Sequence, residues 1–227
     1  MPKYNGRFVV KDIANGVQYL ADLLYQFELG DSLAGWTLGG GTNPTISSDG
    51  RIDLYDASAG VNGSYLVSSI INGAGELLIV AHFKATRMPD DTSTGNNSLI
   101  SGPTSSISLT SGPWFNCTGV NINGTWNNFS GTGISRLLIA GPMTIGREYT
   151  VDIVMDNSKI LFIVDNIYQG MIFRGERGTV ALSATPIQAW LAGSKRIGFW
   201  AGHAAGQISH IQVRDIKVGR LAGIGSV

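Results

Sequence analysis

The segment between Trp114 and Phe129 brings together the residue types that recognise sugars. Five asparagines accompany its four aromatic side chains, Trp114, Phe115, Trp126 and Phe129. Sugars present apolar C–H faces and hydroxyl edges, which aromatic surfaces and nearby amide groups can bind. We therefore predict a glycan site at Trp114, Trp126, Asn127 and Phe129. The alternative is that the two tryptophans pin down a long loop region and cap the core.

Two further residues complete this predicted glycan site. Trp200 lies in IGFWAG, where it alternates with Phe199 and can offer an aromatic surface on a sheet face. His82 lies in ELLIVAHFKAT, where it shares an increasingly polar face with Lys84. We expect His82 to supply a polar contact beside Trp200.

The other reactive side chains form no recognised catalytic or metal-binding motif. His82, His203 and His210 are scattered, and none has a metal-ligand spacing such as H-x-x-x-H. Cys117 has no evident base partner and is interpreted as a small, semi-buried residue. The glycine-rich run at 39–42 is followed by no helix or lysine that could hold phosphate. We therefore predict no catalytic residue, no metal ligand and no cofactor.

The charge of the chain argues against two classes of partner. Sixteen basic and sixteen acidic residues cancel, and charged residues make up only 14% of the 227 positions. Proteins that bind nucleic acids or anionic membranes usually carry a basic excess or stripe. We expect neither kind of partner.

The sequence shows no secretory targeting signal, which predicts synthesis in a cytosol. The N-terminal sequence MPKYNGRFVVKDIANG lacks the apolar run of a secretory signal peptide. No stretch approaches the 18 apolar residues of a transmembrane helix, so we expect no membrane insertion. The single cysteine excludes an internal disulfide.

The pattern of the chain predicts an all-β domain. Its 31 glycines suit many tight turns, and several runs alternate apolar and polar residues with the period of a strand. The run at 149–164 is predicted to form a hairpin that turns at 156–158. In the last strand the apolar set moves from Ile211 and Val213 to Ile216 and Val218, which predicts a β-bulge near Arg214–Asp215.

Two regions differ from this regular pattern. Residues 1–20 are predicted to form a short N-terminal arm that attaches to a neighbouring subunit, with a ragged edge strand as the alternative. Residues 21–227 are predicted to form one domain, with a long aromatic-containing loop region at 88–134. That region is rich in Gly, Ser and Asn but contains short strand-like runs at 98–101 and 105–110.

The segment YTVDIVMDNSKILFIVDNIYQG resembles the hairpin of concanavalin A-like and laminin-G-like domains. Asp165-Asn166 stands at the Asp-Gly turn of that family. IGFWAG with ISHIQVRDIKV is similar to its last two strands, and ADLLYQFELGDSLAGW to its first strand, notably in bacteriophage structural proteins. The resemblance spans about 20–220 and implies a two-sheet antiparallel β-sandwich, the concanavalin A-like jelly roll. It leaves a structural calcium ion open, because some members of the family carry one.

Glycosidases of that family have carboxylates in an E-x-D-x-x-E or E-x-D-x-E run on one strand, as nucleophile and acid/base. The nearest match here is Asp152-Ile153-Val154-Met155-Asp156, in which Val154 replaces the middle acid and Asp156 falls in the predicted turn. We interpret Asp152 as part of a solvated outer face and predict that the chain is not an enzyme.

These features favour a bacteriophage virion protein, such as a capsid decoration protein, head fibre or tail-associated adhesin. We expect it to form a homo-oligomer, to contact other virion proteins through the N-terminal arm, and to bind surface glycans through its loops. Its expected location is the virion, after synthesis in the host cytoplasm. The alternatives are a free carbohydrate-binding lectin and a divergent glycoside hydrolase.

Overall fold

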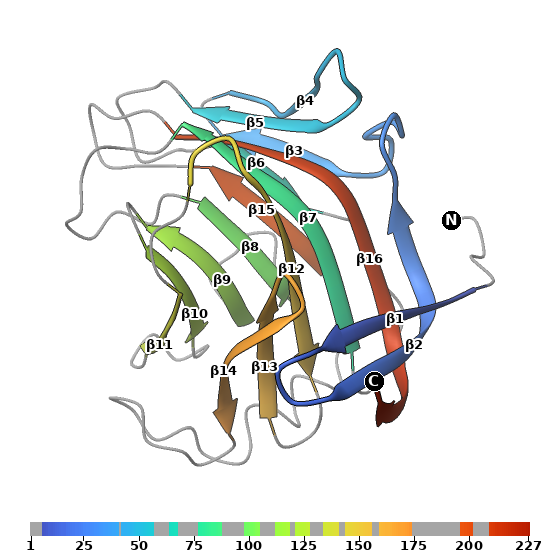
Figure 1. The fold of residues 1–227 in the computed structure, drawn as a ribbon. Coiled ribbons are helices and arrows are strands. Elements are labelled where there is room, and N and C mark those ends of the chain that lie inside the picture. Colours follow the sequence, from blue (N-terminus) through green and yellow to red (C-terminus); the bar gives the residue numbers. More distant parts are fainter. Residues whose placement is uncertain are drawn as a thin grey trace.

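The structure, a computed structural model, is built from antiparallel β-strands. It describes residues 6–40, 42–56, 64–67, 77–87, 98–104, 112–118, 121–127, 134–140, 144–155, 159–173, 196–201 and 209–227. Within these ranges the strands form a nine-stranded and a seven-stranded sheet, and no helix occurs. The predicted all-β, two-sheet antiparallel sandwich is confirmed (Figure 1).

The nine-stranded sheet is built around the long last strand of the chain. Its main path runs β1 (Arg7–Asp12), β2 (Val17–Phe27), β16 (Ser209–Ser226), β7 (Leu77–Arg87), β12 (Glu148–Met155), β13 (Lys159–Val164) and β14 (Ile167–Phe173). Beside this path, β5 (Ile52–Asp56) pairs with β16 and carries the short β4 (Thr45–Ile46) on its other edge.

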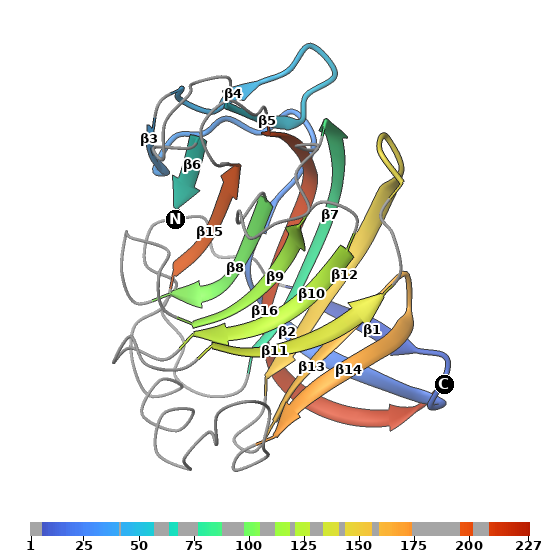
Figure 2. The same ribbon diagram turned by 90° about the vertical axis from the view of Figure 1, so that its left-hand side faces the viewer.

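The seven-stranded sheet contains the aromatic-rich middle of the chain. Its order is β11 (Ile134–Ala140), β10 (Asn121–Asn127), β9 (Gly112–Thr118), β8 (Ser98–Thr104), β15 (Arg196–Ala201), β6 (Ser64–Val67) and β3 (Thr37–Gly40). Figure 2 shows this sheet as a separate layer in front of the nine-stranded sheet.

The main hydrophobic core lies between the two sheets. Alternate positions of the nine-stranded sheet, such as Ile153 and Val213, pack with Leu66 of β6 and Phe199 of β15. All four side chains are fully buried. Burial of side chains of this size contributes about 1.5–3 kcal/mol each, so this layer is the main source of stability.

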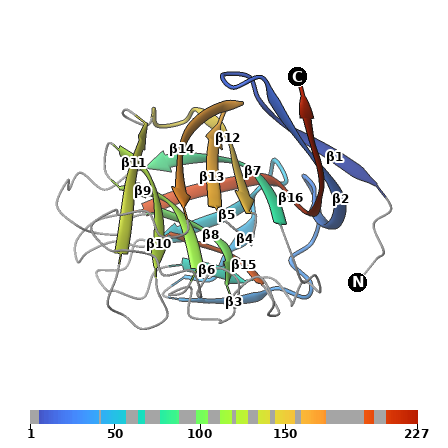
Figure 3. The same cartoon turned by 90° about the horizontal axis from the view of Figure 1, so that it is seen from below.

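A second, smaller core is formed by the nine-stranded sheet alone. Its buried members come from five strands: Val10, Tyr19, Ala21, Val80, Val154, Leu161 and Ile163. In β7, Val80 of this core alternates with Ala81 of the main core, so the sheet buries apolar residues on both faces. The β1–β2 end of the sheet therefore curls over the face that is turned away from the seven-stranded sheet (Figure 3). This face is named the concave face below.

Two close contacts hold the curl in place. The backbone N–H of Ile13, just beyond β1, donates a hydrogen bond to the carbonyl oxygen of Asn166 at 2.9 Å. Phe8 of β1 lies directly over the buried Gly219 of β16, where a Cβ atom would stand 2.6 Å from the Phe8 ring. A side chain at position 219 would therefore occupy space that the hairpin needs.

Two local predictions in the C-terminal half are confirmed. The register between β16 and β7 shifts between Val213 and Asp215, which is the predicted β-bulge. Asp165 and Asn166 form the turn between β13 and β14, with φ values of 52° and 63°. A two-residue hairpin turn with both φ values positive matches the right-handed twist of its strands.

The two irregular regions of the sequence have more strand than expected. Within residues 1–20, β1 and the first part of β2 pair with each other and belong to the nine-stranded sheet. The region at 88–134 contains β8, β9, β10 and the start of β11, while residues 105–111 lie outside the described ranges. Attachment through residues 1–20 stays a prediction. No helix in the described ranges is long and apolar enough to cross a membrane.

Candidate functional site

Strand alternation places a polar surface on the concave face. In β16, His210 and Gln212 alternate with the buried Ile211 and Val213. In β5, Asp53 lies between two side chains of the main core and therefore points to the concave side. Asp53, His210 and Gln212 thus lie together on the concave face, outside the part of it that the second core covers.

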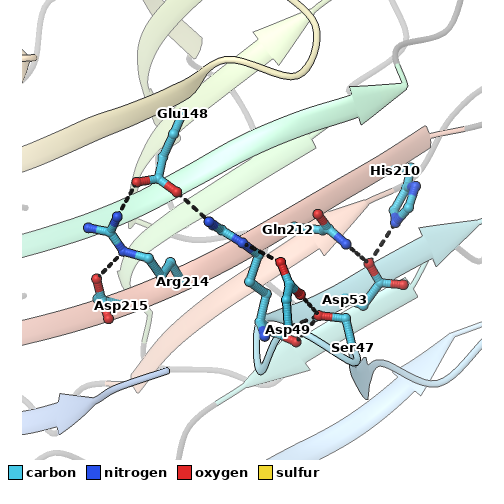
Figure 4. A network of polar contacts seen from close by, with 9 residues as sticks. Ser47, Asp49, Asp53, Glu148, His210, Gln212, Arg214 and Asp215 are labelled. Carbon is cyan, nitrogen blue, oxygen red and sulfur yellow. Dashed lines mark hydrogen bonds and ion pairs between the residues drawn. The ribbon is translucent and has the colours of Figure 1, made fainter. Parts of the chain in front are cut away.

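Glu148 of β12 is the centre of a charged network on this face (Figure 4). Its carboxylate accepts hydrogen bonds from Arg51 at 2.6 Å and from Arg214. Arg51 also donates to Asp49 at 2.9 Å, and Asp49 accepts a 2.6 Å hydrogen bond from the Ser47 hydroxyl. The Ser47 hydrogen bond is the main reason that the pKa of Asp49 lies below its usual value. The network joins the β4–β5 turn to β12 and β16.

The bulge in β16 brings two consecutive residues into this network. Successive residues of a regular strand point to opposite faces, but a bulge inserts a residue and breaks the alternation. Arg214 and Asp215 consequently contact each other, with Arg214 Nε 2.5 Å from Asp215 Oδ2. The bulge thus supplies a positive and a negative group at one point of the concave face.

A second polar group lies beside this network. Asp53 Oδ1 is 2.7 Å from Nε2 of His210 and accepts a 2.7 Å hydrogen bond from Gln212 (Figure 4). Burial acts to raise the pKa of Asp53, but the hydrogen bonds from His210 and Gln212 outweigh it and hold that pKa below its usual value. The half-exposed Tyr55 ring meets the His210 imidazole edge-on, with centroids 5.2 Å apart. An ionised carboxylate, an imidazole, an amide and an aromatic ring are therefore adjacent here.

A pocket of about 220 Å³ lies where the polar surface meets the curled hairpin. One wall comes from β1 and is apolar, with Phe8, Val9 and Val10. The rest combines Val80 with the polar residues His82, Thr150, Asp152, Asn166 and Lys217. The pocket thus has an apolar wall that faces a wall rich in hydrogen-bonding groups.

Asp152 is the most deeply buried polar residue of this pocket. Only 1% of it is exposed, and its Oδ1 atom has no hydrogen-bond partner within the described part of the chain. Burial raises its pKa well above the usual value, and the negative charge of Asp165 adds to the effect. The expected solvated outer face is therefore wrong at this position, because β1 and β2 cover it.

His82 lies next to Thr150 in the β7–β12 ladder and is half-buried. Its Nδ1 atom is 3.5 Å from Asp215 Oδ2, a distance and geometry that make no hydrogen bond. Burial is the largest cause that lowers the pKa of His82, followed by the charge of Arg214, while Asp215 opposes them. We conclude that the imidazole is neutral near pH 7 and that its contact with Asp215 is not an ion pair at that pH.

The structure places His82 in a different sheet from the predicted tryptophans and Asn127. Trp114 lies in β9, Trp126 and Asn127 in β10, and Trp200 in β15, all in the seven-stranded sheet. His82 belongs to β7 of the nine-stranded sheet, so it does not share a sheet with Trp200.

The tryptophan positions of the predicted glycan site do not lie opposite each other in the sheet. The register pairs Trp114 with Thr125 and Trp126 with Pro113, so the two tryptophans belong to neighbouring residue pairs of the β9–β10 ladder. Phe129 lies outside the described residues. A role of these residues in glycan binding stays a prediction.

Sequence reasoning missed most of the residues at the pocket and in the network. The burial of Asp152 had one local signal, since Val154 is apolar at the next position on the same face of β12. Lys217 and Arg214 had none, because both are ordinary polar positions in an alternating strand. In the described ranges, no group of three or more His, Cys, Asp or Glu residues is placed to hold a metal ion.

Comparison with known proteins identifies the fold but not the family. The sequence matches no family model and no curated protein. Among solved structures, one is that of a carbohydrate esterase from the Shiga toxin-encoding bacteriophage phi24B. It has a TM-score of 0.57 and 14% identity over 89% of this chain and 100% of the other.

Two further structures share the architecture with different roles. A family 7 alginate lyase has a TM-score of 0.59 and 10% identity, over 84% of this chain and 96% of its own. The carbohydrate recognition domain of Emp46p has a TM-score of 0.54 and 14% identity, over 89% and 99%. The fold is a jelly-roll β-sandwich of the lectin-like type.

These structures correct one prediction from the sequence. The chain was expected not to be an enzyme, because it lacks the paired carboxylates of the glycosidases. A carbohydrate esterase and an alginate lyase share its fold, so the lack of that one motif does not argue against catalysis.

Proposed function

We propose that this protein binds a carbohydrate chain on the concave face and holds one sugar unit in the pocket. The two-sided lining of the pocket carries the proposal. Phe8 and Val10 can pack against the apolar face of a sugar ring, while Asp152, Thr150 and Asn166 can hydrogen-bond its hydroxyl groups. The lectin-like fold supports the same assignment.

The size of the site fits this division between pocket and surface. Pockets for drug-sized ligands enclose about 300–1,000 Å³, and this one encloses about 220 Å³, which suits a single ring. Further units of the chain would lie over the polar surface, where Tyr55 offers an exposed aromatic ring beside Asp53 and His210.

A glycan-array screen followed by titration of the best ligand tests this proposal. Phe8→Ala should weaken binding at least about tenfold, because one wall of the pocket is lost. Leu38→Ala, at an exposed position of β3 in the other sheet, is the control and should leave affinity unchanged. A Trp114→Ala/Trp126→Ala double variant tests the site predicted from sequence. Loss of binding in that variant, with full binding by Phe8→Ala, would move the site to the seven-stranded sheet.

A divergent glycoside hydrolase is the second candidate function, and Asp152 favours it. A general acid must hold its proton near neutral pH, which a buried carboxyl with a raised pKa can do. Asp152 would give its proton to the glycosidic oxygen as the bond from that oxygen to the sugar carbon breaks. Water would then add to the carbon, and the proton that the water loses would return to the Asp152 carboxylate. Release of reducing sugar by the native protein, lost in Asp152→Asn while binding persists, would support this activity. Binding without any release would leave recognition alone.

We also propose that the protein is part of a bacteriophage virion, as a homo-oligomer that contacts other virion proteins through residues 1–20. The support is the resemblance of its sequence to phage structural proteins, together with a fold that occurs in a phage-encoded protein. Mass spectrometry of purified particles tests this proposal, since a virion component must be present at a constant copy number. Absence of the chain from washed particles would contradict it.

A further inference from the structure

Lys217 is a cation of the pocket wall, and no carboxylate of the described residues pairs with it. It follows the bulge in β16 and is partly buried on the concave face. Within the described part of the chain, its ammonium group makes no ion pair with any Asp or Glu. A half-buried charge without a partner loses hydration, so it is a ready site for a negatively charged ligand group.

The carboxylates around the pocket are already engaged by other cations. Glu148 binds Arg51 and Arg214, and Asp215 also binds Arg214. Asp165, at the turn beside the pocket, pairs with Arg147 at 2.5 Å. None of these acids is therefore held by Lys217.

Asp152 does not neutralise Lys217 either. It is buried, its Oδ1 atom is unpartnered in the described structure, and its environment favours the uncharged acid. His82 is uncharged for the reasons given above. Among the described residues that line the pocket, Lys217 is the only lysine or arginine, while burial of Asp152 and of His82 disfavours the charged form of each.

We infer that the pocket takes a sugar unit that carries a carboxylate, such as a uronic acid, with Lys217 as its ion-pair partner and Asp152 as a hydrogen-bond donor. This inference rests on the proposed carbohydrate binding and names the class of sugar. A protonated carboxyl is both a donor and an acceptor, so Asp152 can donate to a ligand carboxylate that its ionised form would repel.

The register of the sheet places both groups at one level of the pocket. Val80 of β7 pairs with Asp152 of β12 on one side and with Lys217 of β16 on the other. Neighbouring strands lie about 4.8 Å apart, so the two backbones are about 10 Å from each other across Val80. A ligand group above Val80 can reach both side chains, and the ring can lie against Phe8.

Binding should therefore depend on pH through Asp152. The charged or titratable groups on the elements around it include His82 and Lys84 of β7, Arg214, Asp215 and Lys217 of β16, Asp165 of the β13–β14 turn, Glu148 of its own strand and the buried Asp12 of β1. Of these, Asp165 is the one whose charge raises the pKa of Asp152. As the pH rises through that pKa, Asp152 ionises and repels a ligand carboxylate, so affinity for an acidic sugar should fall.

Calorimetric titration with matched sugar pairs tests the inference. The probes are tetramers of galacturonate, glucuronate, mannuronate and guluronate, each compared with its methyl ester, which removes the charge but keeps the ring. At least one acid should bind about tenfold or more tightly than its ester. Lys217→Gln should abolish that preference, whereas Lys11→Gln, an equal charge change at an exposed position of β1, should keep it.

Asp152→Asn separates the acid from a merely structural role. The amide still donates a hydrogen bond but cannot ionise, so the variant should bind the acidic tetramer at neutral pH and lose the fall in affinity at high pH. Equal affinity for acid and ester, or an unchanged preference in Lys217→Gln, would overturn the inference while carbohydrate binding stands. If no acidic or neutral sugar binds in the array or the titrations, both the inference and the proposed function fail.

Discussion

Asp152 of β12 and Lys217 of β16 both pair with Val80 of β7, one from each side. They lie 65 residues apart in the chain, yet their shared pairing with Val80 places them on either side of β7 at the same height of the concave face. The β1–β2 hairpin covers that level, which buries Asp152 and leaves Lys217 at the pocket wall. The chemistry of the pocket therefore depends on the curl of the sheet.

The close packing of Phe8 on Gly219 predicts a sensitive position in β16. In Gly219→Ala the new Cβ would lie 2.6 Å from the Phe8 ring and 2.7 Å from the Ala21 Cβ, so the hairpin must shift. We expect a loss of about 1–3 kcal/mol in the free energy of unfolding, measured by chemical denaturation. Gly223→Ala is the matched control, because no atom lies within 4 Å of a Cβ there. Equal stability of the two variants would show that the hairpin does not pack on Gly219.

The burial of Asp152 predicts a pH-dependent stability. Its folded pKa lies above its unfolded pKa, so the folded state binds more protons between the two values. The free energy of unfolding must then fall as the pH rises from the unfolded pKa through the folded one, by about 1.4 kcal/mol for each unit of separation. Asp152→Asn should remove this fall. Parallel stability curves of native and variant protein between pH 4 and pH 9 would contradict the burial of a protonated acid.

The depressed pKa of His82 predicts a dependence of stability on pH with the opposite sign. Its folded pKa lies below its unfolded pKa, so the unfolded state binds more protons as the pH falls below the unfolded value. Stability should decline on acidification from about pH 6.5 until the folded imidazole also becomes protonated. His82→Gln should reduce this decline, and NMR titration of the imidazole should show an apparent pKa below 6.5. A raised value would mean that the contact with Asp215 dominates.

The ion-pair network around Glu148 should contribute more to the free energy of unfolding than an isolated ion pair on the surface. Glu148→Gln removes the charge that binds both Arg51 and Arg214 in a partly buried setting. We expect it to lower the free energy of unfolding by about 1–2 kcal/mol. Asp22→Asn is the control, because the Arg7–Asp22 pair is more than half exposed and such pairs contribute about 0–1 kcal/mol. Similar losses in both variants would argue against a special role of the network.

The positive φ of Asn166, in the turn between β13 and β14, should make the stability of the protein depend on the residue at this position. Asn166 has a φ of 63°, a conformation that costs most residues about 1–2 kcal/mol. Asn166→Ala should therefore destabilise the protein by about 1 kcal/mol, whereas Asn166→Gly should be neutral or stabilising. Thermal unfolding of both variants measures this, and a loss of stability in the glycine variant would point to the Asn166 side chain rather than the turn.

Several parts of this fold are readable in the sequence because they depend on local order along a strand. The shift of the apolar set from Ile211 and Val213 to Ile216 and Val218 predicts the bulge, which the structure has at Val213–Asp215. The Asp165-Asn166 dipeptide likewise stands at the turn of its hairpin. Alternation with period two, and residues that tolerate a positive φ, are properties of a few neighbouring residues. The residue pattern therefore predicted the all-β class and the bulge, and the resemblance to concanavalin A-like domains implied the sandwich and the turn.

Which face of each strand is covered, and by which other strand, depends on the tertiary structure. Asp152 reads as a solvated position in an alternating strand, yet β1 and β2, more than a hundred residues away, bury it. The same curl makes Lys217 part of the wall of a pocket. The sheet order places His82 and Trp200 in different sheets. A local pattern records whether a residue is polar but not which distant strand packs over it. The pKa of Asp152 and the shape of the pocket therefore follow from long-range packing alone.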